Sequence, residues 1–218
     1  MTRLLQVFVF VMAAWVMIGC SKDNNTYAEI SVEGYGKMKV MLYNETPKHK
    51  ENFIKLASEG FYDGTLFHRV ISGFMIQGGD PDSKTAAPGQ PLGMGGPGYT
   101  LDAEIGSPHF KGALSAARLG GNQNPEKRSS GSQFYIVQGQ AVNDAILDNM
   151  ERQKGIRYSP AQRDLYKQVG GTPFLDNDYT VFGEVVEGFD VIDKIAQAEK
   201  DASDRPTQDI KMEVTILN

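Results

Sequence analysis

The sequence predicts a mainly β domain whose strands close into an antiparallel barrel, with a helical insertion in its second half. From residue 27 onward the chain holds many short runs of alternating or β-branched residues, and turns rich in glycine separate them. Only two segments of this strand-rich part carry clear helix start and stop signals. Closure into a barrel is one way in which many short antiparallel strands avoid leaving exposed edges.

Residues 1–19 lie outside the predicted domain. The run from Leu4 to Ile18 is almost unbroken apolar sequence, which suits a secretory signal peptide and is short for a transmembrane span. It ends in the letters MIGC, which resemble the lipobox of bacterial lipoproteins, so we expect cleavage before Cys20 and acylation of its thiol. Residues 20–26 are then a lipidated tether. The alternative is an ordinary cleaved signal or an uncleaved anchor with an incidental cysteine.

The globular domain, residues 27–218, begins with a predicted hairpin and helix. Residues 27–32 and 37–43 are strand-like and are separated by a Gly-containing turn signal. Thr46 is the predicted N-cap of the helix that follows, with a proline suited to its first turn, and Gly60 ends it.

Strands and loops then alternate up to the predicted insertion. Residues 61–80 return to strand with Gly-marked turns, and residues 83–100, which are rich in proline and glycine, form a loop. Residues 112–117 and 133–137 are short strands on either side of a second loop.

The insertion occupies about residues 139–172. Its apolar spacing favours two helical pieces, from Val142 to Lys154 and from Pro160 to Val169. Strand, helix and closing strand follow, over Thr180 to Val186, Val191 to Ala198 and Ile210 to Leu217.

Charge and cysteine content exclude several classes of protein. The formal net charge of -5 argues against a nucleic-acid binder, and a single cysteine cannot build a disulfide scaffold or a thiolate metal site. Three histidines, His49, His68 and His109, are too far apart in sequence to show metal-ligand spacing. We therefore expect neither a metal nor another cofactor.

Chemically distinctive side chains concentrate in residues 67–81, FHRVISGFMIQGGDP. Strand alternation places Arg69 and Ile71 on one face and, after a Ser-Gly turn, Met75 and Gln77 on another. A guanidinium, a thioether, an aromatic ring and an amide therefore lie within a few residues of one another.

This segment resembles the signature of the cyclophilins, the peptidyl-prolyl cis-trans isomerases. Two further blocks are similar to that family: GALSAA at 112–117 with SGSQFYI at 130–136, and FLDNDYTVFGEV at 174–185. The resemblance implies an eight-stranded antiparallel barrel capped by a helix at each end, with the active groove on an outer face. Residues 139–172 are then either a wall beside that groove or a decorative surface insertion.

The resemblance also implies the site. Arg69, Phe74 and Gln77 are the expected catalytic residues. The expected substrate-binding residues are Met75, Ala117, Gln133, Tyr135, Phe174, Leu175 and Tyr179. Arg118 and Leu119 stand where the family has Asn-Ala, which leaves the substrate preference at that rim open. Taken alone, the apolar residues could equally be barrel core and the polar ones solvated strand positions.

The predicted chemistry needs no nucleophile. Amide resonance opposes rotation about an X-Pro bond with a barrier near ~18–20 kcal/mol. Arg69, which is permanently charged, can donate to the twisted nitrogen or to the prolyl carbonyl, while an apolar pocket grips the ring.

We therefore predict a monomeric prolyl isomerase, lipid-anchored in the bacterial cell envelope and periplasmic or surface-facing. Its expected partners are proline-containing segments of unfolded or exported proteins, with no nucleic acid. The alternative is a non-catalytic module that binds Pro-containing peptides on the same fold.

Overall fold

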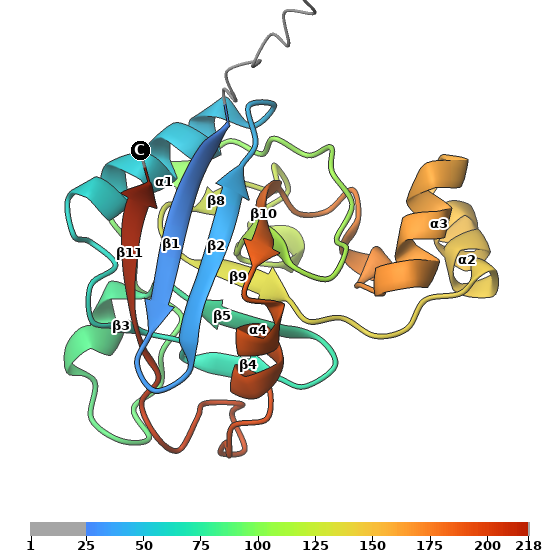
Figure 1. The fold of residues 1–218 in the computed structure, drawn as a ribbon. Helices are drawn as coiled ribbons and strands as arrows, with labels where there is room; N and C mark the ends of the chain where they lie inside the picture. The colour runs from blue at the N-terminus through green and yellow to red at the C-terminus, as the bar shows by residue number, and fades with distance from the viewer. Residues whose placement is uncertain (1–24, 218) are drawn as a thin grey trace, which may run out of the picture.

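Residues 25–217 are described by the computed structural model, so the predicted signal peptide and Cys20 lie outside the described residues. Short strands dominate (Figure 1). The strands are β1 (Thr26–Val32), β2 (Gly36–Leu42), β3 (Thr65–Leu66), β4 (Arg69–Ile71), β5 (Met75–Gly78), β6 (Thr100–Leu101), β7 (Ala113–Ala116), β8 (Ser129–Ser130), β9 (Phe134–Val137), β10 (Val181–Glu187) and β11 (Lys211–Leu217). The α-helices are α1 (Pro47–Ser58), α2 (Asp144–Lys154), α3 (Pro160–Val169) and α4 (Phe189–Ile195).

One curled antiparallel sheet forms the body of the domain. Its nine strands run in the order β3-β11-β1-β2-β10-β7-β9-β5-β4, while β6 and β8 pair separately. The two edge strands, β3 and β4, are joined by only Phe67 and His68, so the sheet must curl to bring its edges together. Mainly β architecture is thereby confirmed.

The sheet departs from the predicted eight-stranded closed ladder. In the described part of the chain the main sheet has nine strands, and its order has two edges. The main-chain N–H groups of Phe67 and Val70 donate to Ile210 and Asp204, in the segment before β11, at 2.9 and 2.8 Å. These N–H groups therefore bond to the segment that precedes β11, and β3 and β4 do not pair with each other.

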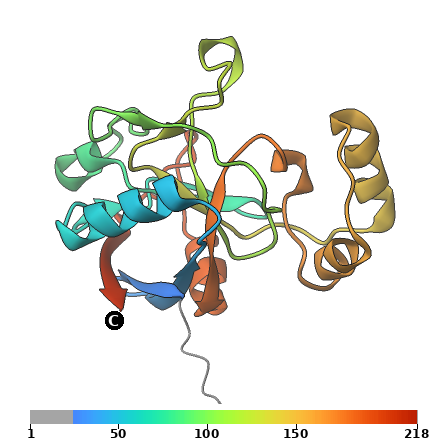
Figure 2. The same cartoon turned by 90° about the horizontal axis from the view of Figure 1, so that it is seen from above.

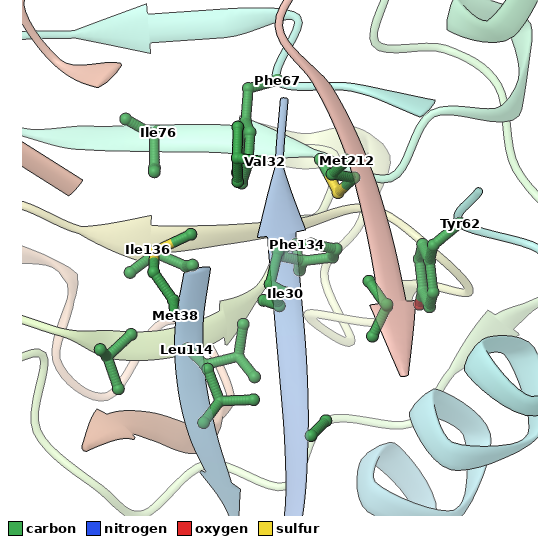
Figure 3. Close-up of a cluster of buried hydrophobic side chains, with 14 of the residues drawn as sticks. Ile30, Val32, Met38, Tyr62, Phe67, Ile76, Leu114, Phe134, Ile136 and Met212 are labelled. Carbon is green, nitrogen blue, oxygen red and sulfur yellow. The ribbon is translucent and has the colours of Figure 1, made fainter. Parts of the chain in front are cut away.

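The core fills the inside of the curled sheet. Alternate residues of the strands point inward, and Ile30, Ile76, Leu114 and Ile136 are fully buried (Figure 3). The Phe134 ring meets aromatic rings of α1 and of the loop that follows it edge-on. Burial of each such side chain contributes about 1.5–3 kcal/mol, so this cluster is what holds the sheet curled.

Helix α1 has Thr46 at its N-cap position, as predicted, but a distant residue supplies the capping hydrogen bonds. Thr46 makes no side-chain capping hydrogen bond. Instead the carboxylate of Glu104 accepts from the main-chain N–H groups of Lys48 and His49, at 3.1 and 3.0 Å. A carboxylate at this point also complements the positive end of the helix. No sequence-local signal marks such a cap, because Glu104 is distant along the chain.

The predicted helical pieces of residues 139–172 are α2 and α3, which project to one side of the sheet (Figures 1 and 2). Gly155, with φ 66°, ends α2, and Ser159 opens α3 with a capping box. The pair has a small core of its own, in which Leu147 and Tyr166 are fully buried. Within residues 25–217 no helix has both the length and the apolar character needed to cross a membrane.

Candidate active site

The strand register builds the site on the outer face of the sheet. Arg69 on β4 is paired with Gln77 on β5, Gln77 with Tyr135 on β9, and Tyr135 with Ser115 on β7. Directly opposed residues share a face, so Arg69 and Gln77 lie side by side. The sequence-based placement of these two residues on different faces is therefore wrong, because the turn after Ile71 returns the chain in register.

An apolar cluster separate from the core lies beside Arg69. Met75, Tyr135 and Leu175 are among its buried members, and Phe74 and Tyr179 are among the partly buried side chains that pack against it. Together with Arg69 and Gln77 they line a pocket of about 370 Å³. A pocket of this size that combines apolar side chains with convergent polar groups is a usual form of a small-ligand site.

The guanidinium of Arg69 stands at the edge of this pocket. Its Nη1 donates to Oε1 of Gln77 at 3.4 Å, and Gln77 Nε2 donates to Oε1 of Gln133 at 3.1 Å. Gln133 Nε2 in turn donates to the carbonyl of Gly95 at 2.7 Å. Arg69 forms no ion pair with a carboxylate among residues 25–217, and its bond to Gln77 leaves other N–H donors of this pocket-lining guanidinium available.

A glycine-rich loop divides the groove into two compartments. The second, of about 660 Å³, shares Gln77, Gly93, Ala117 and Arg118 with the first. The fully buried Asp80 holds this loop, because its Oδ2 accepts from the main-chain N–H groups of Gly93 and Gly95 at 2.5 and 3.3 Å.

Arg118 is a further guanidinium that lines both compartments of the groove. Its Nε donates to the carbonyl of Asp178 at 2.8 Å, and its Nη1 donates to the carbonyl of Leu119 at 3.0 Å. The guanidinium also lies 4.5 Å from the centre of the Tyr179 ring, a cation-π arrangement. No carboxylate of the described chain pairs with it. The side chain is therefore fixed in place with an uncompensated charge.

Most of the predicted site residues are brought together along the groove, whereas Phe174 lies outside both compartments. The ring of Phe174 is 51% exposed and does not line the first compartment; it packs on Phe74 with ring centres 5.4 Å apart. Gln133 lines the second compartment and reaches the first only through Gln77. Ala117 lines both.

Sequence reasoning missed part of the wall. His68, Arg205 and the loop residues from Gly89 to Gly93 also line the first compartment. His68 is buried, and burial lowers the pKa of its ring below the ordinary value. Arg205 ties the loop down, because its Nη1 donates to the carbonyls of Ala87 and Gln90. The Pro-Gly loop could not be placed from sequence, since its anchors are far away in the chain.

No group of three or more potential metal-ligating side chains occurs within residues 25–217. Guanidinium groups, two amides and a cluster of apolar side chains thus meet on the outside of a curled antiparallel sheet. Such a surface can hold a compact apolar ring next to hydrogen-bond donors.

Comparison with known proteins identifies the family. Residues 27–216 match the family described as "Cyclophilin type peptidyl-prolyl cis-trans isomerase/CLD". The chain therefore belongs to the cyclophilin-type peptidyl-prolyl cis-trans isomerases, and the predicted family and enzyme class are confirmed.

Two sequence relatives show how far the similarity extends. A Staphylococcus aureus (strain USA300) protein that carries a peptidyl-prolyl cis-trans isomerase name is 39% identical over 184 residues, covering 82% of this chain and 85% of the relative. A Streptococcus pyogenes protein is 38% identical over 200 residues and is named as a bifunctional phosphatase and peptidyl-prolyl cis-trans isomerase. The match covers 88% of this chain but spans only 39% of the length of that streptococcal relative.

Solved structures agree with the fold. A cyclophilin-type isomerase of Cryptosporidium parvum superposes with a TM-score of 0.65 at 27% identity, covering 89% of this chain and 98% of the other. A second crystal structure of that protein, obtained in the presence of the dipeptide Ala-Pro, gives a TM-score of 0.63 and covers 88% and 99%.

Proposed function

We propose that the first compartment is the prolyl pocket of this isomerase and that Arg69 is its catalytic donor. The observation that carries the proposal is the juxtaposition of a guanidinium that has no ion-pair partner among residues 25–217 with a cluster of apolar side chains in one pocket. The crystal structure of the Cryptosporidium relative in the presence of the dipeptide Ala-Pro supports a proline-containing ligand for this fold.

The geometry suits rotation about an X-Pro bond. The barrier arises from amide resonance, which is lost when the nitrogen becomes pyramidal and gains a lone pair. Arg69 can donate a charge-assisted hydrogen bond to that nitrogen or to the prolyl carbonyl, worth about 1.5–3 kcal/mol. Gln77 holds the guanidinium beside the pocket, and Gln133 fixes Gln77 in turn.

The apolar residues of the pocket select for the prolyl ring. Met75, Tyr135 and Leu175 are buried beneath the pocket, and Phe74 covers its edge, so a prolyl ring is gripped without a hydrogen-bonding demand. Excluding water from this contact strengthens the interaction of Arg69 with the rotating amide.

Amide chemical-shift mapping tests the location of the site. A 15N-labelled protein titrated with an Ala-Pro tetrapeptide should show its largest shifts in residues 69–77 and 133–135, which carry the pocket. The amide shifts of β1 and β11, which are not neighbours of β4, β5 or β9 in the strand order, should remain unchanged. Shifts confined to β1 and β11 would place the peptide elsewhere and overturn the proposal.

We also propose that the protein is a lipid-anchored monomer that acts on exported proteins in the bacterial cell envelope. The support is the MIGC sequence ending at Cys20 and the apolar run before it. The first strand begins at Thr26, six residues after the acylated cysteine, so the tether can span at most about 20 Å. The domain would accordingly work close to the membrane surface.

Finally, we propose that the curled sheet behaves as the closed barrel predicted from the sequence. Residues 67–70 would complete it through their main-chain hydrogen bonds to Ile210 and Asp204. Slow hydrogen exchange of the Phe67 and Val70 amides would support this closure, whereas exchange as fast as in an open edge strand would oppose it.

A further inference from the structure

The two-helix segment of residues 139–172 does not line the groove. Among the described residues, neither compartment includes any member of this segment. The predicted wall beside the groove is therefore not what the segment provides. It does, however, contact the short stretch from Leu175 to Tyr179, both of whose end residues line the first compartment.

The main contact is a buried carboxylate. Oδ2 of Asp176 accepts from the hydroxyl of Tyr158, at 2.7 Å, and from the hydroxyl of Tyr166 on α3, at 2.6 Å. Its Oδ1 accepts from the main-chain N–H of His109 at 2.8 Å. Asp176 is 4% exposed, so these donors replace the water that its charge would otherwise require.

The carboxylate is connected onward to the pocket through His109. Nδ1 of this fully buried ring lies 2.8 Å from Oδ1 of Asp176, and Nε2 lies 3.0 Å from the hydroxyl of Tyr135. A carboxylate only accepts, so Nδ1 donates to it, and Nε2 is the ring atom left to pair with the hydroxyl of Tyr135. The rings of His109 and Tyr135 are also stacked, 9° from parallel.

A second connection comes from α2. Nζ of Lys154 donates to the main-chain carbonyl of Asp176 at 2.8 Å and pairs with the carboxylate of Asp178. The carbonyl of Asp178 accepts from Arg118 in the groove. Residues 175–179 are thus held at two points from the inserted helices, one buried and one partly buried.

We infer that the two-helix segment is a positioning element: through Asp176 and His109 it fixes Tyr135, and through Asp176 and Lys154 it fixes the stretch that carries Leu175. Tyr158 and Tyr166 are its positioning residues and touch no substrate. The inference rests on the proposed prolyl pocket, because Tyr135 and Leu175 matter to turnover only if that pocket holds the ring.

A double-mutant cycle tests the connection. Tyr166→Phe removes one donor to Asp176 and keeps the ring in the small core of the inserted helices. We expect kcat/KM on an X-Pro tetrapeptide to fall about fivefold, since small displacements of pocket groups reduce turnover strongly. In a Tyr135→Phe background the same change should have a much smaller effect, because the group through which it acts has lost its hydrogen bond.

Tyr62→Phe is the matched control. Tyr62 is equally buried, and its hydroxyl donates to a main-chain carbonyl in the barrel core, 3.3 Å away. It should lower the midpoint of unfolding without changing kcat/KM. Should Tyr166→Phe fail to fold, Lys154→Gln, on the partly exposed side, tests the second connection with the same assay.

The outcomes separate this inference from the site itself. Wild-type kcat/KM in both folded Tyr166→Phe and folded Lys154→Gln overturns the positioning role. It is also overturned if Tyr166→Phe lowers kcat/KM by the same factor with and without Tyr135→Phe. Failure of the prolyl pocket would appear differently, as unchanged activity in an Arg69→Ala variant.

Discussion

Replacing Gly95 with alanine should damage the loop that divides the groove. A Cβ atom at this position would lie 2.1 Å from Oδ1 of Asp80 and 2.8 Å from Oδ2 of Asp82. Non-bonded heavy atoms do not approach that closely, so the loop must move away from the buried Asp80.

The loss of stability and activity depends on the hydrogen bonds that this movement of the loop breaks. The Gly95 N–H loses its bond to the Asp80 carboxylate, and the Gly95 carbonyl moves away from Nε2 of Gln133. Loss of a hydrogen bond to a buried charge lowers the free energy of unfolding by about 1.5–3 kcal/mol. Because Gln133 orients Gln77, a weakening of about 1.4 kcal/mol at this point would reduce kcat/KM about tenfold.

Gly96→Ala is the control within the same loop, since a Cβ there meets no atom within 4 Å. Urea unfolding followed by circular dichroism gives the stability, and a coupled isomerisation assay gives kcat/KM. Gly95→Ala should have a lower free energy of unfolding and a lower kcat/KM than the wild type, and Gly96→Ala should change neither quantity. Indistinguishable behaviour of the two variants would refute the argument that the loop is held against Asp80.

Three further predictions concern charge, pH and the N-terminus. Arg118→Gln should reduce kcat/KM several-fold more for a peptide with Glu next to proline than for a peptide with Lys there, because this guanidinium lines both compartments and has no ion-pair partner in the described chain. Arg152→Gln removes an equal charge on α2 and should leave the ratio of kcat/KM for the two peptides unchanged. Burial lowers the pKa of the His68 ring from its ordinary value of about 6.5. As the pH falls below that ordinary value, the unfolded chain therefore binds a proton at His68 more readily than the folded chain does. The free energy of unfolding should therefore fall as the pH drops below about 6.5, and less steeply in His68→Asn; an identical slope in urea titrations would contradict this. Cys20→Ala should abolish fatty-acid labelling and release the protein from the membrane fraction, and persisting label would exclude acylation at that cysteine.

The order of elements could be read from the sequence because its signals are local. The hairpin of β1 and β2, helix α1 with Pro47 near its start, and α2 and α3 all follow from alternation, capping residues and glycines within a few positions. What failed depends on contacts between distant segments. Glu104 caps α1 from far along the chain, and the register of β4 on β5 decides the face on which Gln77 lies.

The candidate site shows the same division. Residues inside the linear motifs, such as Arg69 and Met75, are brought together as expected. Phe174 lies outside the pocket because the chain turns through a 3-10 helix there, which points its ring to Phe74 and solvent. The network around Asp176 joins segments separated by tens of residues, and no spacing rule marks it.

The activity of an Arg69→Ala variant on a short X-Pro peptide is the decisive test of Arg69 as the catalytic donor. The side chain is exposed at the edge of the pocket, so the variant should unfold at nearly the wild-type urea concentration. Loss of one charge-assisted hydrogen bond to the rotating amide, about 1.5–3 kcal/mol, should lower kcat/KM about 10–100-fold, and Arg69→Lys should recover little because an ammonium lacks the planar fork. A folded Arg69→Ala protein with wild-type kcat/KM would contradict the assignment of Arg69 as the catalytic donor.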